Sequence, residues 1–221
     1  MRRLAPPLLA ALLALASAFA VFAPPAFAKP VPAKLSADDR QELGRVEGYL
    51  NEIGTLKGRF LQVAPSGATS EGDLYLSRPG KLRLQYDPPV PILVVATGTW
   101  LVYHDSELKQ TSYVLLNSTP AGILVRRNLV LEGGDVTVTR VERKAGLTAV
   151  SLVQTEDAAA GEITLVFTQQ PFQLRQWKVK DPQGQITTVS LFDAQPGIAL
   201  DGKLFEFADP KAGELKMPLG N

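Results

Sequence analysis

Residues 72–89, GDLYLSRPGKLRLQYDPP, contain two runs in which apolar and polar side chains alternate. Leucine or tyrosine occupies each even position from 74 to 86 outside the central turn, and most odd positions are polar. A period of two places successive side chains on opposite faces of a strand. The segment therefore predicts two strands joined by a turn at residues 78–80. Their apolar face is expected to consist of Leu74, Leu76, Leu82, Leu84 and Tyr86.

Strand patterns of this kind dominate the chain. β-Rich runs separated by Gly, Pro, Ser or Asp extend from residue 56 to 116 and again from 135 to 209, where 204–209 is predicted to be the last strand. We count about ten or eleven strands. A sheet of ten strands is ~48 Å wide, whereas a helix is only ~10 Å across. Such a sheet is expected to curl into an incompletely closed barrel, because few helices are available to cover it.

Two or three helices are predicted, and two of them can be placed. The first begins after Ser36, a good N-cap with Asp39 three residues on, and its apolar stripe is formed by Leu43, Val46, Leu50 and Ile53 before Gly54 ends it. The second begins at Thr119-Pro120, contains Ile123 and Leu124, and extends to Arg126-Arg127, with residues 128–134 continuing as helix or loop. Two helices over the mouth of a curled sheet can leave an apolar pocket, although a fully packed β core fits the same pattern.

The N-terminus has the features of a secretory signal peptide. Arg2 and Arg3 precede an apolar stretch rich in Ala and Leu, and Ala26-Phe27-Ala28 is an A-x-A cleavage site. We therefore expect three parts: a cleaved signal peptide at 1–28, a flexible leader at 29–35 and a single domain at 36–221. An uncleaved anchor is the alternative, but the apolar stretch is short for a membrane span.

Charge and composition narrow the classes of function. After removal of the signal peptide, the chain has 21 basic and 22 acidic residues and a net charge of −1 with histidine neutral. A nearly neutral chain has no bulk electrostatic attraction to nucleic acid. The chain has no cysteine and one histidine, His104, so the ligand clusters of a metal site and the usual Ser-His-Asp triad have few candidates. The residues favour binding over catalysis, and we expect no catalytic residue, metal or cofactor.

Several motifs together closely resemble the LolA family of periplasmic lipoprotein carriers, from about residue 40 to 211. The shared positions are Phe60 and Gln62 in the first strand, Gly72, Leu74 and Tyr75 before the turn Arg78-Pro79-Gly80-Lys81, Tyr103 and Gln110, Thr119-Pro120 and Leu124, Asp181 and Gly184, and Phe205 and Phe207. The chain departs from the family after the turn. Members of the family often have aromatic residues there, whereas this chain has Leu82 and Leu84.

The resemblance implies a mainly β fold: an unclosed, half antiparallel β-barrel of about ten or eleven strands, with two or three helices as a lid over a hydrophobic cavity. The cavity would shelter lipoprotein acyl chains in the periplasm. Cargo would come from an inner-membrane ABC transporter of the LolCDE type and pass to the outer membrane, through a LolB-type acceptor where one is present. The carrier would be a monomer without enzymatic activity. We expect the five residues of the apolar face to line the cavity and Ile123 and Leu124 to lie on the lid.

Arg78 occupies an even position, so its side chain is expected to lean towards the apolar face. A guanidinium there needs acceptors, and the carbonyl oxygens at the end of a lid helix carry partial negative charge. The family resemblance also associates this arginine with closing the lid, so we expect Arg78 to act as a lid latch. A solvated turn arginine is the alternative.

Two other functions remain open at this stage. A LolA-like module could sense lipid or lipoprotein and regulate rather than transport, which a stable protein partner would indicate. A hydrolase of acyl substrates could use the same β scaffold, which turnover of a fluorescent ester would reveal.

Overall fold

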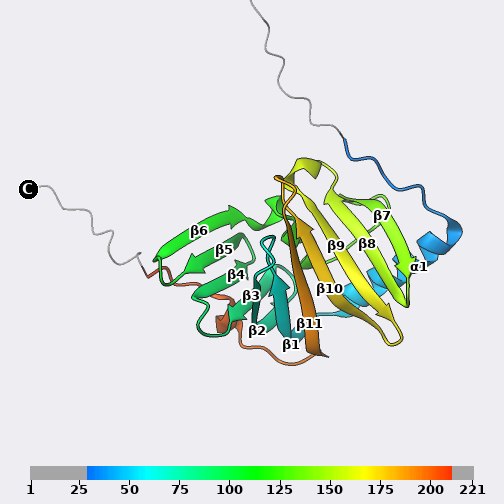
Figure 1. Cartoon of the computed structure of the whole chain (residues 1–221). Coiled ribbons are helices and arrows are strands. Elements are labelled where there is room, and N and C mark those ends of the chain that lie inside the picture. Colours follow the sequence, from blue (N-terminus) through cyan, green and yellow to red (C-terminus); the bar gives the residue numbers. More distant parts are fainter. Residues whose placement is uncertain (1–28, 211–221) are drawn as a thin grey trace, which may run out of the picture.

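The computed structural model describes residues 29–210, so the predicted signal peptide lies outside the described residues. Eleven strands form one antiparallel sheet in the order β6-β5-β4-β3-β2-β1-β11-β10-β9-β8-β7. Strands β6 and β7 stand at its two edges, so the sheet curls without closing (Figure 1). The expected unclosed antiparallel half-barrel is confirmed.

Consecutive strands are neighbours in the sheet except β6 and β7, which η1, α2 and a loop connect from one edge to the other. Their bounds are β1 (Thr55–Val63), β2 (Thr69–Ser77), β3 (Lys81–Tyr86), β4 (Ile92–Thr97), β5 (Trp100–Asp105), β6 (Gln110–Leu115), β7 (Val136–Lys144), β8 (Leu147–Gln154), β9 (Glu162–Gln169), β10 (Phe172–Lys180) and β11 (Ile186–Pro196). The two halves of the sheet, β1–β6 and β7–β11, meet where β1 pairs with β11.

The described residues contain two α-helices and three short 3-10 helices. These are α1 (Ala37–Glu52), α2 (Pro120–Leu124), η1 (Leu116–Ser118), η2 (Ala158–Ala160) and η3 (Gly202–Phe205). Within residues 29–210, no helix combines the length and the apolar character needed to span a bilayer.

Helix α1 begins as its sequence predicts. The Ser36 hydroxyl accepts a hydrogen bond from the Asp39 N–H, and the Asp39 carboxylate accepts one from the Ser36 N–H, which completes a capping box. Leu43, Val46 and Leu50 are buried along one side of the helix. Figure 1 shows α1 lying behind β8, β9 and β10, so its apolar side faces the concave surface of the sheet.

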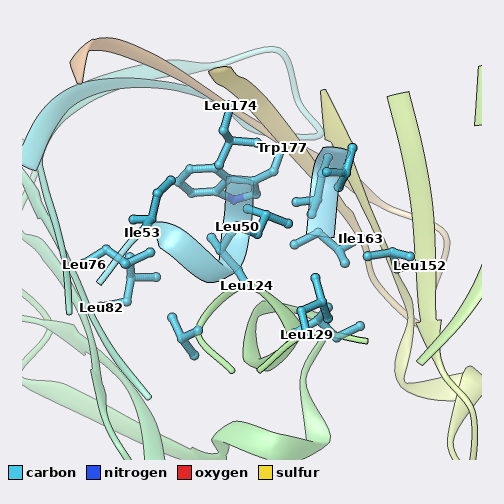
Figure 2. Close-up of a cluster of buried hydrophobic side chains, with 14 of the residues drawn as sticks. Leu50, Ile53, Leu76, Leu82, Leu124, Leu129, Leu152, Ile163, Leu174 and Trp177 are labelled. Atoms are coloured by element: carbon cyan, nitrogen blue, oxygen red, sulfur yellow. The ribbon is translucent and has the colours of Figure 1, made fainter. Parts of the chain in front are cut away.

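The hydrophobic core lies between the concave surface and the helices. In Figure 2, Leu50 of α1 and Leu124 of α2 lie between Leu76 and Leu82 on one side and Ile163 on the other. All five side chains belong to one buried cluster that joins both halves of the sheet. The helices therefore fill the hollow of the half-barrel with their own apolar side chains.

The segment at 29–35 has no regular secondary structure, but its end contacts the sheet. Ala33 donates its N–H to the carbonyl oxygen of Val138 in β7 at 2.8 Å, and Ala33 and Leu35 pack against the core cluster. Part of the expected flexible leader therefore lies along the outer edge of β7.

The predicted last strand at 204–209 is wrong. Residues 202–205 form η3, and the chain then continues without regular structure. Phe205 is buried, and the Leu204 carbonyl oxygen accepts a hydrogen bond from Arg83 Nη1 at 3.1 Å. The apolar residues that suggested a strand serve instead to pack the segment on the convex side of β3 and β4.

The predicted extension of the second helix is also wrong, because α2 ends at Leu124 and residues 125–135 form a loop. The backbone of this loop bonds to other elements. The Val125 carbonyl oxygen accepts from Gly80, and the Leu129 and Leu131 N–H groups donate to side chains of α1. These contacts replace the hydrogen bonds that a longer helix would make.

Candidate functional site

The leucines of β2 and β3 form paired rows on the concave surface. Leu74 lies opposite Leu84, and Leu76 lies opposite Leu82. Directly paired residues of antiparallel strands project from the same face, so the four side chains form one patch. Their exposed fractions are between 0% and 7%, and Tyr86 is half-buried at the margin of the same cluster. We call these five residues the leucine face.

The leucine face is covered by the helices and by the loop that follows α2. Leu50 of α1, Ile123 and Leu124 of α2, and Leu129 of the loop belong to the same cluster and are almost completely buried. Ile123 and Leu124, which were expected on the lid, are buried in the same cluster as the leucine face. We call α2 together with residues 125–135 the lid segment.

Arg78 joins the turn between β2 and β3 to both helices. Its Nη1 donates to the carbonyl oxygen of Leu50 in the last turn of α1. Its Nη2 donates to the carbonyl oxygen of Leu124, the last residue of α2, at 2.5 Å. One side chain therefore satisfies a carbonyl group at the C-terminal end of each helix, where such groups lack partners within the helix.

Two opposing effects act on the charge of the Arg78 guanidinium. Helix C-termini carry partial negative charge, which favours a cation beside them. Burial disfavours the same cation and lowers the pKa of Arg78 to about 10. No carboxylate forms an ion pair with Arg78 among the described residues, and its buried Nε has no hydrogen-bond partner there. The guanidinium thus depends on two carbonyl oxygens, and the contact is lost when either helix moves away.

The backbone of the same turn adds two further contacts. Arg78 donates its N–H to the Gly54 carbonyl oxygen, and Gly80 donates to that of Val125, each at 2.7 Å. Gly80 has a φ of 78°, in the left-handed region that favours glycine. The turn is therefore attached to the end of α1 and to the start of the loop after α2.

The lid segment is also attached to α1 directly. Asn51 accepts a hydrogen bond from the Leu129 N–H at 2.8 Å and donates one to the Leu129 carbonyl oxygen at 2.9 Å. Glu47 accepts from the Leu131 N–H at 2.9 Å. Polar side chains of α1 thus fix the position of the loop over the apolar core.

A separate polar network holds the first half of α1 on the sheet. Glu42 is buried and accepts hydrogen bonds from Thr148 at 2.9 Å and from Gln169 at 2.7 Å. Arg45 donates to the other Glu42 oxygen at 3.1 Å and lies over the Phe172 ring at 4.3 Å from its centre. Burial acts to raise the pKa of Glu42, but the hydrogen bonds from Gln169 and Thr148 and the charge of Arg45 outweigh it, so the pKa is lowered.

Glu42 was not among the predicted site residues. Its position supplied a usable signal, because Glu42 lies four residues before Val46 and therefore on the apolar side of α1. A carboxylate on that side requires buried partners. Sequence spacing does not reveal that the partners are Thr148 and Gln169, more than a hundred residues away.

The aromatic margin of the leucine face is organised around Tyr86. Its hydroxyl donates to Gln62 at 2.7 Å, and its ring meets Phe60 edge-on at 5.1 Å between ring centres. Burial raises the pKa of Tyr86 to about 12, so the phenol stays protonated and neutral. Phe60 and Gln62, which the sequence identified as motif residues, thus position a tyrosine at the edge of the apolar surface.

Among residues 29–210, no three His, Asp or Glu side chains gather as metal ligands would. His104, the single histidine, bonds Thr111 at 3.0 Å and packs against Phe207 on the convex side. The candidate site is an apolar surface covered by the helices and the lid segment, which suits binding of apolar groups.

Comparisons with known proteins identify the family. The family model described as "Outer membrane lipoprotein carrier protein LolA" matches residues 51–208. The outer-membrane lipoprotein carrier protein of Methylococcus capsulatus is 30% identical over 175 residues, covering 75% of this chain and 83% of that protein. The protein of the same name from Pseudomonas aeruginosa strain UCBPP-PA14 is 30% identical over 191 residues, covering 79% and 86%.

A solved structure of a LolA superfamily protein from Nitrosomonas europaea superposes with a TM-score of 0.42 at 12% identity, covering 74% of this chain and 97% of that one. The family model covers well over half of the chain, and the curated relatives align with most of its length. The chain belongs to the LolA family.

Proposed function

We propose that this protein is a periplasmic carrier that shelters the acyl chains of lipoproteins and delivers them to the outer membrane. The observation that carries the proposal is the leucine face, a continuous apolar surface closed by a lid segment and fastened by Arg78. Membership of the LolA family and the names of the curated relatives support the choice of cargo. The expected secretory signal supports the compartment.

The energetics favour exchange between lid and cargo. Removing apolar surface from water is worth about 0.8 kcal/mol per methylene, so an acyl chain gains much by leaving water. The leucine face is already buried by the helices in the closed protein. Cargo binding therefore has to replace contacts that the lid makes, which keeps the net affinity low enough for release.

The proposed cycle requires two membrane partners. An inner-membrane ABC transporter of the LolCDE type would load the carrier, and an outer-membrane acceptor of the LolB type would receive the cargo where one exists. The carrier would act as a monomer. Sheltering and handing over a lipoprotein requires no covalent step, cofactor or catalytic residue.

Co-purification tests this function. The mature protein, carrying a C-terminal tag, is expressed in the periplasm and recovered under mild conditions, and bound material is analysed by mass spectrometry. We expect triacylated lipoproteins in stoichiometric amounts with the wild type and far less with Leu84→Glu. Recovery of the wild type without acylated protein, from cells with active lipoprotein export, would contradict the proposal.

A further inference from the structure

The apolar rows of the leucine face continue onto the outer strands of the sheet. One row crosses five strands through directly paired residues, and its members are Leu76, Leu82, Ala96, Leu101 and Val114. Direct pairing keeps all of them on the concave face. The exposed fraction is 3% at Leu82 and 47% at Val114. The row thus begins beneath the lid and ends in the open.

A neighbouring row behaves in the same way. It runs through Leu74, Leu84, Val94, Tyr103 and Ser112, again by direct pairing. Leu74 is fully buried, Val94 is partly buried at the margin of the core cluster, and Tyr103 is 46% exposed. We call the outer members of the two rows, Val94, Leu101, Tyr103 and Val114, the outer strip.

The two exposed members of the outer strip are Tyr103 of β5 and Val114 of β6, whereas Val94 and Leu101 are partly buried against the core cluster. Figure 1 shows α1 behind β8–β10, while β4, β5 and β6 extend away from it at the other end of the sheet. The segment after η3 lies on the opposite, convex face, where Phe207 contacts His104 and Tyr113 at 5.4 and 6.2 Å between ring centres. Two exposed side chains on the concave face, Tyr103 and Val114, are therefore joined through the partly buried Val94 and Leu101 to the closed site.

We propose that the outer strip is the entrance to the acyl-chain site, on which a cargo acyl chain lies before the lid segment moves. This inference rests on the proposed carrier function. The chain would then pass along the two rows onto the leucine face as the lid lifts. The closed protein would thus capture cargo without first exposing its buried core to water.

The chemistry of the strip selects an acyl chain as the occupant. Its four members carry no charge, and the one polar group among them is the Tyr103 hydroxyl at the rim. An acyl chain needs contact area without hydrogen-bond partners, which such a surface provides. Continuity with the leucine face means that a chain bound on the strip need not re-enter water before it reaches the buried site.

Kinetics of lipopeptide binding test the proposal. A synthetic triacylated cysteinyl lipopeptide is mixed with the full mature protein in a stopped-flow instrument. If capture on the strip precedes lid opening, the loading rate follows occupancy of the strip, and losing contact worth one methylene slows loading about fourfold. Val114→Ser should show such slowing. Tyr113→Ser is the matched control, because Tyr113 is 46% exposed on the same strand but faces the convex side.

A second readout reports contact directly. The chain lacks cysteine, so a single Ser112→Cys or Thr111→Cys variant can carry a polarity-sensitive dye on the concave or the convex face of β6. Lipopeptide should shift the emission of the dye at position 112 and leave that at position 111 unchanged. Phosphatidylcholine vesicles serve as the other source of acyl chains, and an equal response to them would overturn the assignment to cargo.

The possible failures are distinguishable. If lipopeptide binds stoichiometrically but Val114→Ser loads as fast as the wild type, or the dye at position 112 stays silent, the outer strip is not the entrance and the carrier function stands. If the wild type binds no lipopeptide at all, the carrier function itself is contradicted.

Discussion

Arg78 Nη2 donates a hydrogen bond to the carbonyl oxygen of Leu124 at 2.5 Å, so the turn between β2 and β3 is tied to the last residue of α2. If α2 moves when cargo binds, this bond is broken. We therefore expect it to stabilise the closed, empty protein and to contribute nothing to the loaded form. A lid contact of this kind favours release of cargo.

Replacing Arg78 by leucine should disturb handover more than loading. The substitution removes both bonds to helix carbonyls and adds apolar surface beside the leucine face. Lipopeptide binding should be retained or strengthened, whereas transfer from the loaded carrier to outer-membrane vesicles should slow about tenfold or more, as expected for the loss of a charge-assisted hydrogen bond worth about 1.5 kcal/mol. Transfer is followed by sedimenting the vesicles and measuring bound lipopeptide.

Arg83→Leu is the matched control for Arg78. Arg83 also donates to a backbone carbonyl, that of Leu204, but it lies on the convex side of the neighbouring strand β3. The Arg83→Leu variant should transfer cargo at the wild-type rate. The transfer rate of Arg78→Lys should lie between those of the wild type and Arg78→Leu. Equal transfer rates for Arg78→Leu and wild type would leave Arg78 as a turn residue without a latch role.

A charge on the leucine face should abolish binding. Leu84 is 7% exposed and faces the helices, so Leu84→Glu buries a carboxylate without a partner or raises its pKa until it is neutral. We expect a loss of about 3 kcal/mol in the free energy of unfolding and no measurable lipopeptide binding. Gln85→Glu, exposed on the opposite face of the same strand, should bind normally. Normal binding by a well-folded Leu84→Glu protein would mean that this surface is not the site.

The polar network of Glu42 should make stability depend on pH. The pKa of Glu42 is lower in the folded protein than its ordinary value of 4.5. The ionised group therefore contributes stability above about pH 4.5, and the contribution disappears as the pH falls through the lowered folded pKa. Glu42→Gln should reduce the free energy of unfolding by about 1 to 2 kcal/mol at pH 7.

The comparison of the two stability curves is the informative measurement. Urea unfolding of wild type and Glu42→Gln between pH 7 and pH 3 should show the difference shrinking towards the acid end. Glu52→Gln, at the exposed end of the same helix, is the control for helix charge. A difference that stays constant over this range would show that the charge of Glu42 is not what holds α1.

Gly72 offers a test of sheet packing. A Cβ at this position would overlap the backbone carbonyl of Gln85 and approach the Phe60 ring to 2.8 Å. Gly72→Ala should therefore destabilise the protein by about 1 to 3 kcal/mol, the usual cost of overpacking. Gly67→Ala is unsuitable as a control because its φ is 85°, whereas Gly44→Ala in α1 meets no atom within 4 Å and should leave stability unchanged or raised.

Local patterns predicted most of the fold. The alternation at 72–89 gave the correct strands and the correct buried face, and Ser36 with Asp39 marked the start of α1, because period and capping are properties of neighbouring residues. Residues 204–209 were wrongly predicted as a strand because their pattern, too, reports only on neighbouring residues. Their apolar spacing suits a strand, but whether such a segment pairs at a sheet edge or packs across a face depends on distant surfaces.

The site was predictable only where parity determined it. The alternation in β2 predicted that Arg78 lies on the concave side of the sheet. It could not predict which carbonyl groups lie there. The carbonyl groups of Leu50, in the last turn of α1, and of Leu124, the last residue of α2, meet one guanidinium because α1 and α2 pack together in the hollow of the sheet. The partners of Glu42 and the attachment of the lid loop to Asn51 likewise join segments far apart in the chain, which no local pattern encodes.

The central claim is that cargo and lid segment compete for the leucine face, and amide hydrogen exchange tests it most directly. Three amides report the closed lid: Gly80 donates to Val125, Leu129 to Asn51 and Leu131 to Glu47. With one equivalent of triacylated lipopeptide bound, these three amides should exchange at least tenfold faster, because lid contacts worth about 1.4 kcal/mol or more are replaced by acyl chains, while amides of β9 and β10 stay protected. Unchanged protection at Gly80, Leu129 and Leu131 in the fully loaded protein would contradict the account.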